Sequence, residues 1–130
     1  MFLDTSGLFC MHRGDEPGSE EAVETFEAAG RTLTQSYVLA ELVALSRTRG
    51  MPRSQTLVFV RALIAHLQVE VVWVDAELNE AALSLLDARP DKGYSLCDAV
   101  SFVLMRRRGI YEALTTDRHF EQEGFVRLPN

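Results

Sequence analysis

The sequence predicts an α/β fold in which helices cover both faces of a parallel sheet, giving a three-layer αβα sandwich. Short apolar or β-branched segments alternate with segments whose apolar residues recur at helical spacing. Such alternation is typical of parallel sheets, whose strands are buried on both faces. The chain has 130 residues, of which 47% are hydrophobic, and this suits one domain spanning residues 1–130.

The first half of the chain contains two expected strands and three expected helices. These elements are a strand at 2–3, a helix at 19–29, a strand at 32–35 and helices at 36–46 and 54–67. Gly30 ends the first of these helices, and Gly50 and Pro52 close the second, because glycine and proline both terminate helices.

The second half continues the alternation. Its expected elements are a strand at 69–74, a helix at 76–88, a turn at 90–93, a helix at 95–107, a strand at 112–116, a short helix from Arg118 and a strand at 125–128. The segment "VEVVWV" at 69–74 is the clearest strand, because it is both apolar and β-branched.

Two aspartates follow expected strands. Asp4 comes directly after the first strand, and Asp117 comes after the fourth. In parallel sheets a site forms beyond the carboxyl ends of the strands, where strand order reverses, so the two carboxylates converge if these strands are neighbours. The alternative interpretation is that each aspartate caps the helix that follows it.

A third aspartate, Asp98, lies at the start of the strongly apolar helix at 95–107. Its polar companions on this helix are Ser95 and Ser101. The alternative for Asp98 is a capping box with Ser95, although glutamate or glutamine is the usual partner in that motif.

Glu41 is the fourth acid of interest, in the segment "YVLAELVAL". Apolar or small residues surround it on every side, which predicts a buried helix. No lysine or arginine lies three or four residues away, so a nearby ion partner on the same helix is excluded. A buried, unpaired carboxylate is costly, and this favours a metal ligand over a structural acid.

Together the four acids predict a site for a hard divalent cation. Oxygen ligands without histidine or cysteine select Mg²⁺ or Mn²⁺. Clustered carboxylates repel one another, and a divalent cation removes that conflict. Such clusters serve phosphoryl chemistry, in which the metal stabilises charge and activates water.

Four segments in order carry a family resemblance: "FLDTSGL", "AELVAL", "YSLCDAVSFVLMRRRGI" and "ALTTDRHFEQEGF". They resemble the motifs of PIN-domain ribonucleases, especially VapC-type toxins. The resemblance implies a five-stranded parallel sheet in the order 3-2-1-4-5. It implies catalytic acids around Mg²⁺ or Mn²⁺ at four positions: Asp4, Glu41, Asp98 and Asp117.

The resemblance also assigns supporting residues. Ser6 and Thr116 match polar positions near the metal, and Ser95 is a further candidate for contact with Asp98 or with substrate. Cys97 departs from the family, where threonine commonly precedes the third acid, and this puts one supporting contact in doubt. In the "DRHF" segment we expect Phe120 to pack in the core and His119 to be a solvated surface residue.

The basic residues form two groups that we interpret as candidate RNA contacts. The net charge is −6, yet twelve of the thirteen basic residues are arginine, which binds phosphate well. The candidates are Arg47, Arg49 and Arg53 in a stretch without acids, and Arg106, Arg107 and Arg108. The alternative is that each group is a solvated helix end, where cations suit the helix dipole.

Composition also bears on location and partners. No apolar run approaches a membrane span, Asp4 interrupts any signal-peptide pattern, and Cys10 and Cys97 have no metal-binding spacing. We therefore expect a cytoplasmic protein without membrane contact. The resemblance adds three expected partners: an RNA substrate, a cognate antitoxin and a second copy in a homodimer. It does not reveal which RNA is cut.

Three other interpretations compete. A response-regulator receiver would need an acidic pair after the first strand and a lysine after the fifth, but Lys92 is the only lysine and lies in a turn. A phosphatase of the haloacid dehalogenase type would need a DxD motif, but Thr5 and Ser6 follow Asp4. The serious alternative is a non-catalytic binding or regulatory module that keeps the PIN fold.

Overall fold

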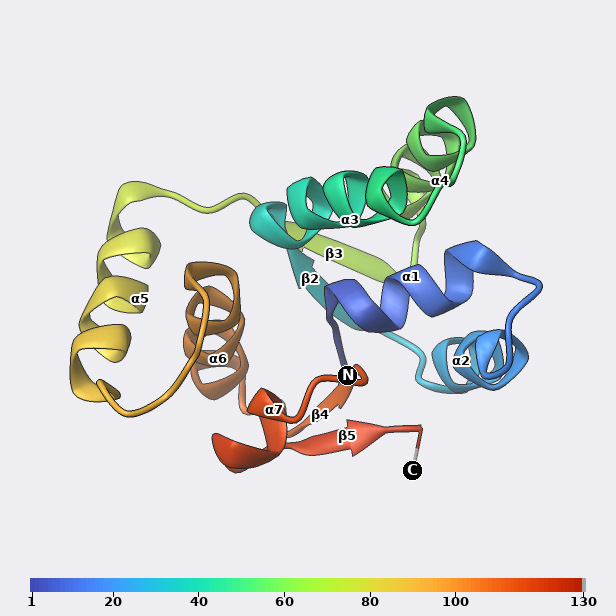
Figure 1. Ribbon diagram of the computed structural model, residues 1–130. Helices are drawn as coiled ribbons and strands as arrows, with labels where there is room; N and C mark the ends of the chain where they lie inside the picture. Colours follow the sequence, from blue (N-terminus) through green and yellow to red (C-terminus); the bar gives the residue numbers. More distant parts are fainter. Residues whose placement is uncertain (130) are drawn as a thin grey trace.

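The sheet has five parallel strands in the order β3-β2-β1-β4-β5, as expected. A computed structural model describes residues 1–129 and is drawn in Figure 1. The shortest strand, β1 (Phe2–Leu3), lies at the centre, where Phe2 is opposite both Leu33 of β2 and Ala113 of β4. Strand order reverses there, so the carboxyl ends of β1 and β4 form the switch point of the fold.

The element bounds agree closely with those expected from the sequence. The remaining strands are β2 (Thr32–Gln35), β3 (Val69–Val72), β4 (Glu112–Leu114) and β5 (Val126–Leu128). The helices are α1 (Thr5–Arg13), α2 (Ser19–Ala28), α3 (Ser36–Thr48), α4 (Arg53–Ala65), α5 (Ala76–Ala88), α6 (Leu96–Arg108) and α7 (His119–Gln122). The sequence analysis assigned no bounds to α1, and it extended the fourth strand through two threonines that the structure leaves in a loop.

Helices cover both faces of the sheet. Helices α5 and α6 pack together over one face, while α1 to α4 lie on the other (Figure 1). Helix α6 is the main support, because most of its side chains are buried against the sheet or against α7. Among residues 1–129 no helix is both long enough and apolar enough to cross a membrane.

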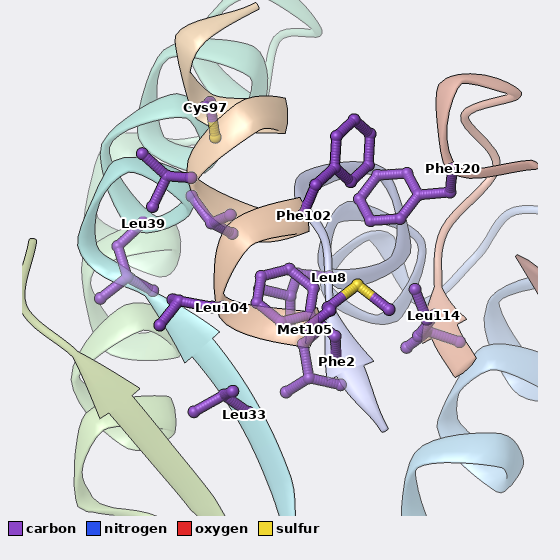
Figure 2. Packing of buried hydrophobic residues seen from close by; sticks show 14 of the residues in the cluster. Phe2, Leu8, Leu33, Leu39, Cys97, Phe102, Leu104, Met105, Leu114 and Phe120 are labelled. Atoms are coloured by element: carbon purple, nitrogen blue, oxygen red, sulfur yellow. The ribbon is translucent and has the colours of Figure 1, made fainter. Parts of the chain in front are cut away.

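Aromatic contacts join α6 to the C-terminal segment. Figure 2 shows Phe102 of α6 and Phe120 of α7 side by side, with ring centroids 4.9 Å apart in an edge-to-face arrangement. Both side chains are fully buried, and Phe102 also stacks on Phe125. The expectation that Phe120 packs in the core is confirmed. This packing fixes the loop after β4 relative to the start of α6.

Close packing of α1 on β4 depends on Gly7. A Cβ atom added at this position would lie 2.2 Å from the backbone oxygen of Leu114, far inside van der Waals contact. Only glycine therefore allows the first turn of α1 to approach the end of β4. The approach matters because it brings residues 4–6 next to the loop that follows β4.

We predict that Gly7→Ala lowers the free energy of unfolding by about 1–3 kcal/mol or more, because the added methyl group over-packs the core. This loss is expected even though alanine favours helix formation more than glycine does. Cys10→Ala, one turn further along α1 and half-exposed, should cost less. Urea unfolding of the two variants measures the difference. Equal stabilities would show that α1 does not need the close approach.

Candidate metal centre

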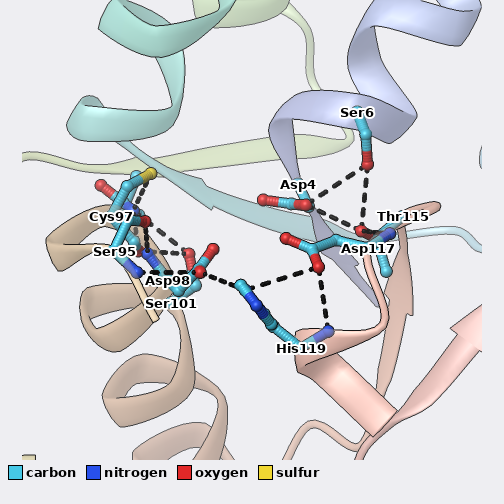
Figure 3. A network of polar contacts seen from close by, with 10 residues as sticks. Asp4, Ser6, Ser95, Cys97, Asp98, Ser101, Thr115, Asp117 and His119 are labelled. Atoms are coloured by element: carbon cyan, nitrogen blue, oxygen red, sulfur yellow. Dashed lines mark hydrogen bonds and ion pairs between the residues drawn. The ribbon is translucent and has the colours of Figure 1, made fainter. Parts of the chain in front are cut away.

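The centre lies at the carboxyl ends of β1 and β4, which are neighbours in the sheet. Leu3 and Leu114 are paired across the two strands, so the residues that follow them, Asp4 and Thr115, emerge side by side. Asp117 follows two residues later, and the start of α6 brings Asp98 to the same edge (Figure 3). The convergence of carboxylates expected from the sequence depends on this adjacency.

Asp4 is buried, with 4% of its surface exposed, and is held by hydroxyl groups. Thr115 Oγ1 donates to Asp4 Oδ2 at 2.7 Å, and Ser6 Oγ lies 3.4 Å from the same oxygen. Asp4 occupies the N-cap position of α1 but makes no capping bond through its side chain. The capping interpretation of Asp4 is therefore wrong.

Thr115 and Ser6 connect Asp4 to the loop after β4. Thr115 Oγ1 accepts a bond from the backbone N–H of Asp117 at 3.0 Å, and Ser6 Oγ accepts one from that of Thr116 at 2.9 Å. The two hydroxyl oxygens lie 3.1 Å apart. Figure 3 shows how Ser6 and Thr115 lie between Asp4 and Asp117, an arrangement that fixes the position of one carboxylate relative to the next.

The side chain that supports Asp4 is thus Thr115, whereas the sequence analysis chose Thr116. Thr116 is exposed and reaches Ser6 through its backbone. The two threonines are consecutive, and only the strand pairing shows which one points toward Asp4. Ser6 lies in contact with Asp4, where the resemblance placed it.

Burial raises the pKa of Asp4 from 3.8 to about 7. Loss of solvent is the largest cause, and the negative charges of Asp98 and Asp117 raise the pKa further, while the bond from Thr115 lowers it. Near neutral pH the ionised form of the Asp4 carboxylate is therefore destabilised by its surroundings in the folded protein. A cation beside these three aspartates would remove that destabilisation, so the donor set fits a hard divalent metal.

Asp98 both caps α6 and faces the centre. Its Oδ2 accepts the backbone N–H of Ser95 at 3.1 Å, and Ser95 Oγ accepts the backbone N–H of Asp98 at 3.0 Å. The capping box is therefore confirmed, and it fixes the rotamer of Asp98. Capping does not prevent a role at the centre, because the Asp98 carboxylate also contacts His119 of α7.

The sequence analysis interpreted His119 as a solvated surface residue. The structure corrects this: His119 is half-buried, and its Nδ1 lies 2.9 Å from Asp98 Oδ2 and 3.5 Å from Asp117 Oδ1. Its ring meets Tyr94 edge to face, with centroids 5.3 Å apart. The contact between Nδ1 and Asp98 Oδ2 joins α7 to the start of α6.

Among residues 1–129, ligand atoms of Asp98, Asp117 and His119 all lie within 4.8 Å of one another. Asp117 also accepts the backbone N–H of His119 at 2.9 Å, which is a bond of the capping kind. Asp4 lies beside this group, since both aspartates act on its pKa. The arrangement can bind a cation and present it to a substrate at the edge of the sheet.

The expectation that Glu41 is buried is wrong. Helix α3 buries Val38, Leu39 and Leu42, whereas Glu41 is exposed, together with the small residues at 40 and 44. The alanines made the helix look apolar on every side although it has one solvent face. Glu41 still lies on the side of the centre, because its charge, like those of Asp4 and Asp98, raises the pKa of the buried Cys97 thiol, for which burial is the main cause.

Cys97, where the family resemblance led us to expect threonine, faces Gln35 rather than an aspartate. Gln35 Nε2 lies 3.5 Å from the sulfur and donates to the backbone oxygen of Cys97 at 3.2 Å. Gln35 also donates to Ser101 Oγ at 3.2 Å. Gln35 is fully buried, and these bonds attach the end of β2 to the first turns of α6.

The second arginine group lies at the other end of α6 from the centre. Arg106, Arg107 and Arg108 end the helix, whereas Asp98 lies in its first turn, roughly 12–15 Å away at 1.5 Å per residue. Each guanidinium is paired with a glutamate, in the pairs Arg106–Glu123, Arg107–Glu77 and Arg108–Glu70. These pairs link α6 to neighbouring elements, and RNA contact by these arginines stays a prediction.

The first arginine group lies on the side of α3 and α4. Arg47 and Arg53 line a hollow of about 300 Å³ together with Ala40, Ala44 and Met51. Arg49 lines a second hollow, which also contains Ser6 and Thr116. Arg49 is therefore the member of this group that lies beside residues of the centre.

Comparison with known proteins identifies the family. The family model for the PIN domain matches residues 1–125, and the chain belongs to this family. The resemblance recognised in the four sequence segments is therefore confirmed.

Particular relatives agree. The chain is 34% identical over 96 residues to the 23S rRNA-specific endonuclease VapC20 of Mycobacterium tuberculosis, in strains CDC 1551 / Oshkosh and ATCC 25618 / H37Rv. That match covers 74% of this chain and 72% of the relative. The crystal structure of M. tuberculosis VapC20, described as a sarcin–ricin loop cleaving toxin, superimposes with a TM-score of 0.86 at 28% identity. It covers 96% of this chain and 95% of that one.

The raised pKa of Asp4 predicts an unusual pH dependence of stability in chelator. The unfolded carboxyl has a pKa near 3.8 and the folded one near 7, so the folded state holds the proton to higher pH. Asp4 therefore lowers the free energy of unfolding as pH rises from about 4 to about 7, by up to roughly 1.4 kcal/mol per pH unit. Above pH 7 its contribution is constant.

Asp4→Asn should remove this dependence, so the variant should be more stable than the wild type at pH 8 and closer to it at pH 4. Chemical unfolding in EDTA at several pH values measures the difference. Asp87→Asn, on the exposed surface of α5, is the matched control. If the free energy of unfolding changes with pH in the same way for Asp4→Asn and the wild type, Asp4 does not have the raised pKa.

Proposed function

We propose that the protein is a metal-dependent endoribonuclease that hydrolyses RNA phosphodiester bonds and acts as the toxin of a toxin–antitoxin pair. One observation carries the proposal: Asp4, Asp98 and Asp117 converge at the switch point, where Asp4 is buried at a cost that a cation relieves. Membership of the PIN family and similarity to the VapC20 endonuclease support it.

In this proposal Asp4, Asp98 and Asp117 hold Mg²⁺ or Mn²⁺, and Glu41 contributes from the exposed face of α3. A bound divalent cation would stabilise negative charge on the phosphate and make a water molecule easier to deprotonate. His119, which the sequence did not place at the site, lies in one cluster with Asp98 and Asp117, and in this proposal it holds the Asp98 carboxylate in position through Nδ1.

The residues around the acids keep them in place. Thr115 and Ser6 orient Asp4, and the capping box together with His119 orients Asp98. Fixed carboxylates need no reorganisation when charge develops, which is how pre-organised sites lower a barrier. No histidine is required to activate the ribose 2′-hydroxyl, because the attacking group is water.

The relatives suggest the first RNA to test. VapC20 is described as specific for 23S rRNA and as cleaving the sarcin–ricin loop. We propose that this chain also cuts a structured RNA loop, and that Arg47, Arg49 and Arg53 contact its backbone. Arg49 supports this proposal, because it lines a hollow together with Ser6 and Thr116.

Partners are proposed on the same grounds. Helix α4 exposes Val58 and Ile64, and the following loop exposes Leu67, which supports contact with a second copy or with an antitoxin. The proposed antitoxin would be encoded beside this protein. It would place a basic side chain near the acids, whose negative charge complements it. The cytoplasm is the proposed location, consistent with the two free cysteines.

We predict metal-dependent cleavage of an RNA that contains the sarcin–ricin loop. EDTA should abolish cleavage, Mn²⁺ should restore it, and the products should end in 5′-phosphate and 3′-hydroxyl. Asp4→Asn and Asp98→Asn should each reduce the rate by more than about 100-fold, since losing even a group that supports a metal ligand costs 10–100-fold. Gel analysis of end-labelled RNA measures rate and end chemistry.

Asp87→Asn is again the control, because it makes the same change on the exposed surface of α5 and should cleave like the wild type. Products with 2′,3′-cyclic phosphate, or full activity in EDTA, would contradict the mechanism. RNA binding without cleavage in Mn²⁺ and in Mg²⁺ would instead favour a non-catalytic member of the family.

A further inference from the structure

A small basic hollow adjoins the acidic centre between α1 and the end of α3. Its volume is about 220 Å³, and its lining includes Phe9, Arg13, Glu16 and Arg49. Ser6 and Thr116 also line it. The hollow is separate from the larger one that contains Arg47 and Arg53.

The hollow is continuous with the centre through two shared residues. Ser6 Oγ contacts Asp4 Oδ2 and also accepts the backbone N–H of Thr116, so both residues border the carboxylates on one side and the hollow on the other. A polymer that places one phosphate at the acids therefore places a neighbouring part of the same strand against this hollow.

Two guanidinium groups converge on one aromatic ring in the hollow. Those of Arg13 and Arg49 lie 5.4 Å and 5.8 Å from the ring centroid of Phe9. Phe9 is 6% exposed, so it is a fixed platform rather than a mobile side chain. Cation–π contact draws both guanidinium groups to the same ring, and two arginines near one hollow suit a phosphate, which accepts paired N–H bonds.

One of the two arginines is partly neutralised within the chain. Glu16 pairs with Arg13 across the end of α1, while Arg49 forms no ion pair among residues 1–129. The Arg13–Glu16 pair is solvent-accessible, with 27% and 43% of the two side chains exposed. Pairs of this kind contribute only about 0–1 kcal/mol, so a phosphate can displace Glu16.

We propose that this hollow is a phosphate-binding subsite for the RNA strand. Arg13 and Arg49 bind a backbone phosphate next to the scissile one, and Glu16 occupies Arg13 until RNA displaces it. The inference rests on the proposed function and adds to it an RNA contact, Arg13, and an internal competitor, Glu16, that the sequence analysis did not identify.

The test measures binding separately from cleavage. All binding variants carry Asp98→Asn so that the RNA stays intact, and the probe is a fluorescein-labelled sarcin–ricin hairpin followed by anisotropy. Arg13→Ala and Arg49→Ala should each weaken binding about 3- to 10-fold. Each should also lower the slope of log Kd against log salt by about 0.7, the value for one lost phosphate contact on a single strand.

Glu16→Gln should tighten binding about 2- to 5-fold, and this gain should vanish when Arg13→Ala is also present. That non-additivity separates competition for Arg13 from a general change in net charge. Arg61→Ala, exposed on α4, and Glu20→Gln, exposed on α2, make the same charge changes elsewhere and serve as matched controls.

The outcomes are distinct. The proposed subsite is wrong if Arg13→Ala and Arg49→Ala bind RNA with the same Kd as the control Arg61→Ala. It is also wrong if Glu16→Gln has the same Kd as the control Glu20→Gln. Both conclusions hold even where the wild type cleaves the hairpin. If the wild type fails to cleave any RNA in Mn²⁺, the proposed function is wrong. Loss of binding specific to the two arginines, together with cleavage by the wild type, supports both.

Discussion

Burial of the Asp4 carboxylate at the end of the central strand is the constraint on which the rest of the site depends. The strand contributes only two residues, both without exposed surface, so Asp4 has little freedom to move toward solvent. Folding places this carboxylate near those of Asp98 and Asp117, and its pKa rises to about 7. Hydroxyl groups offset part of the cost, and a divalent cation would offset the remainder. The fold accepts a locally unfavourable charge cluster because the structure around it is stabilised elsewhere, by the aromatic contacts of α6 with α7 and by the close packing at Gly7.

Much of the fold could be predicted from residue patterns because those patterns reflect burial. The β-branched segment at 69–74 and the glycines after α2 and α3 marked their elements within a few residues. The order of strands followed from the family resemblance and not from periodicity. Helix α1 received no bounds, since "TSGLFCMHR" mixes small, polar and apolar residues, and its glycine reflects contact with β4, which is invisible in a local pattern.

The site was only partly predictable, and the differences all concern contacts distant in sequence. Asp4, Asp98 and Asp117 could be chosen from their places after strands and at a helix start. Thr115 and His119 were missed, because their partners lie 111 and 21 residues away. The ion pairs of Arg107 and Arg108 were not predicted either, because their glutamate partners lie 30 and 38 residues away. Glu41 was expected to be buried because alanines resemble core residues in sequence while occupying a solvent face.

Calorimetric titration of the wild type with Mn²⁺ at pH 7, in two buffers with different ionisation enthalpies, tests the central claim most directly. A bound carboxylate must be ionised, and a group with a pKa of about 7 is half protonated at this pH. The account predicts that binding releases roughly half a proton per chain from Asp4, and that Asp4→Asn binds more weakly without this release. Failure to bind Mn²⁺, or binding with equal proton release in both proteins, would contradict it.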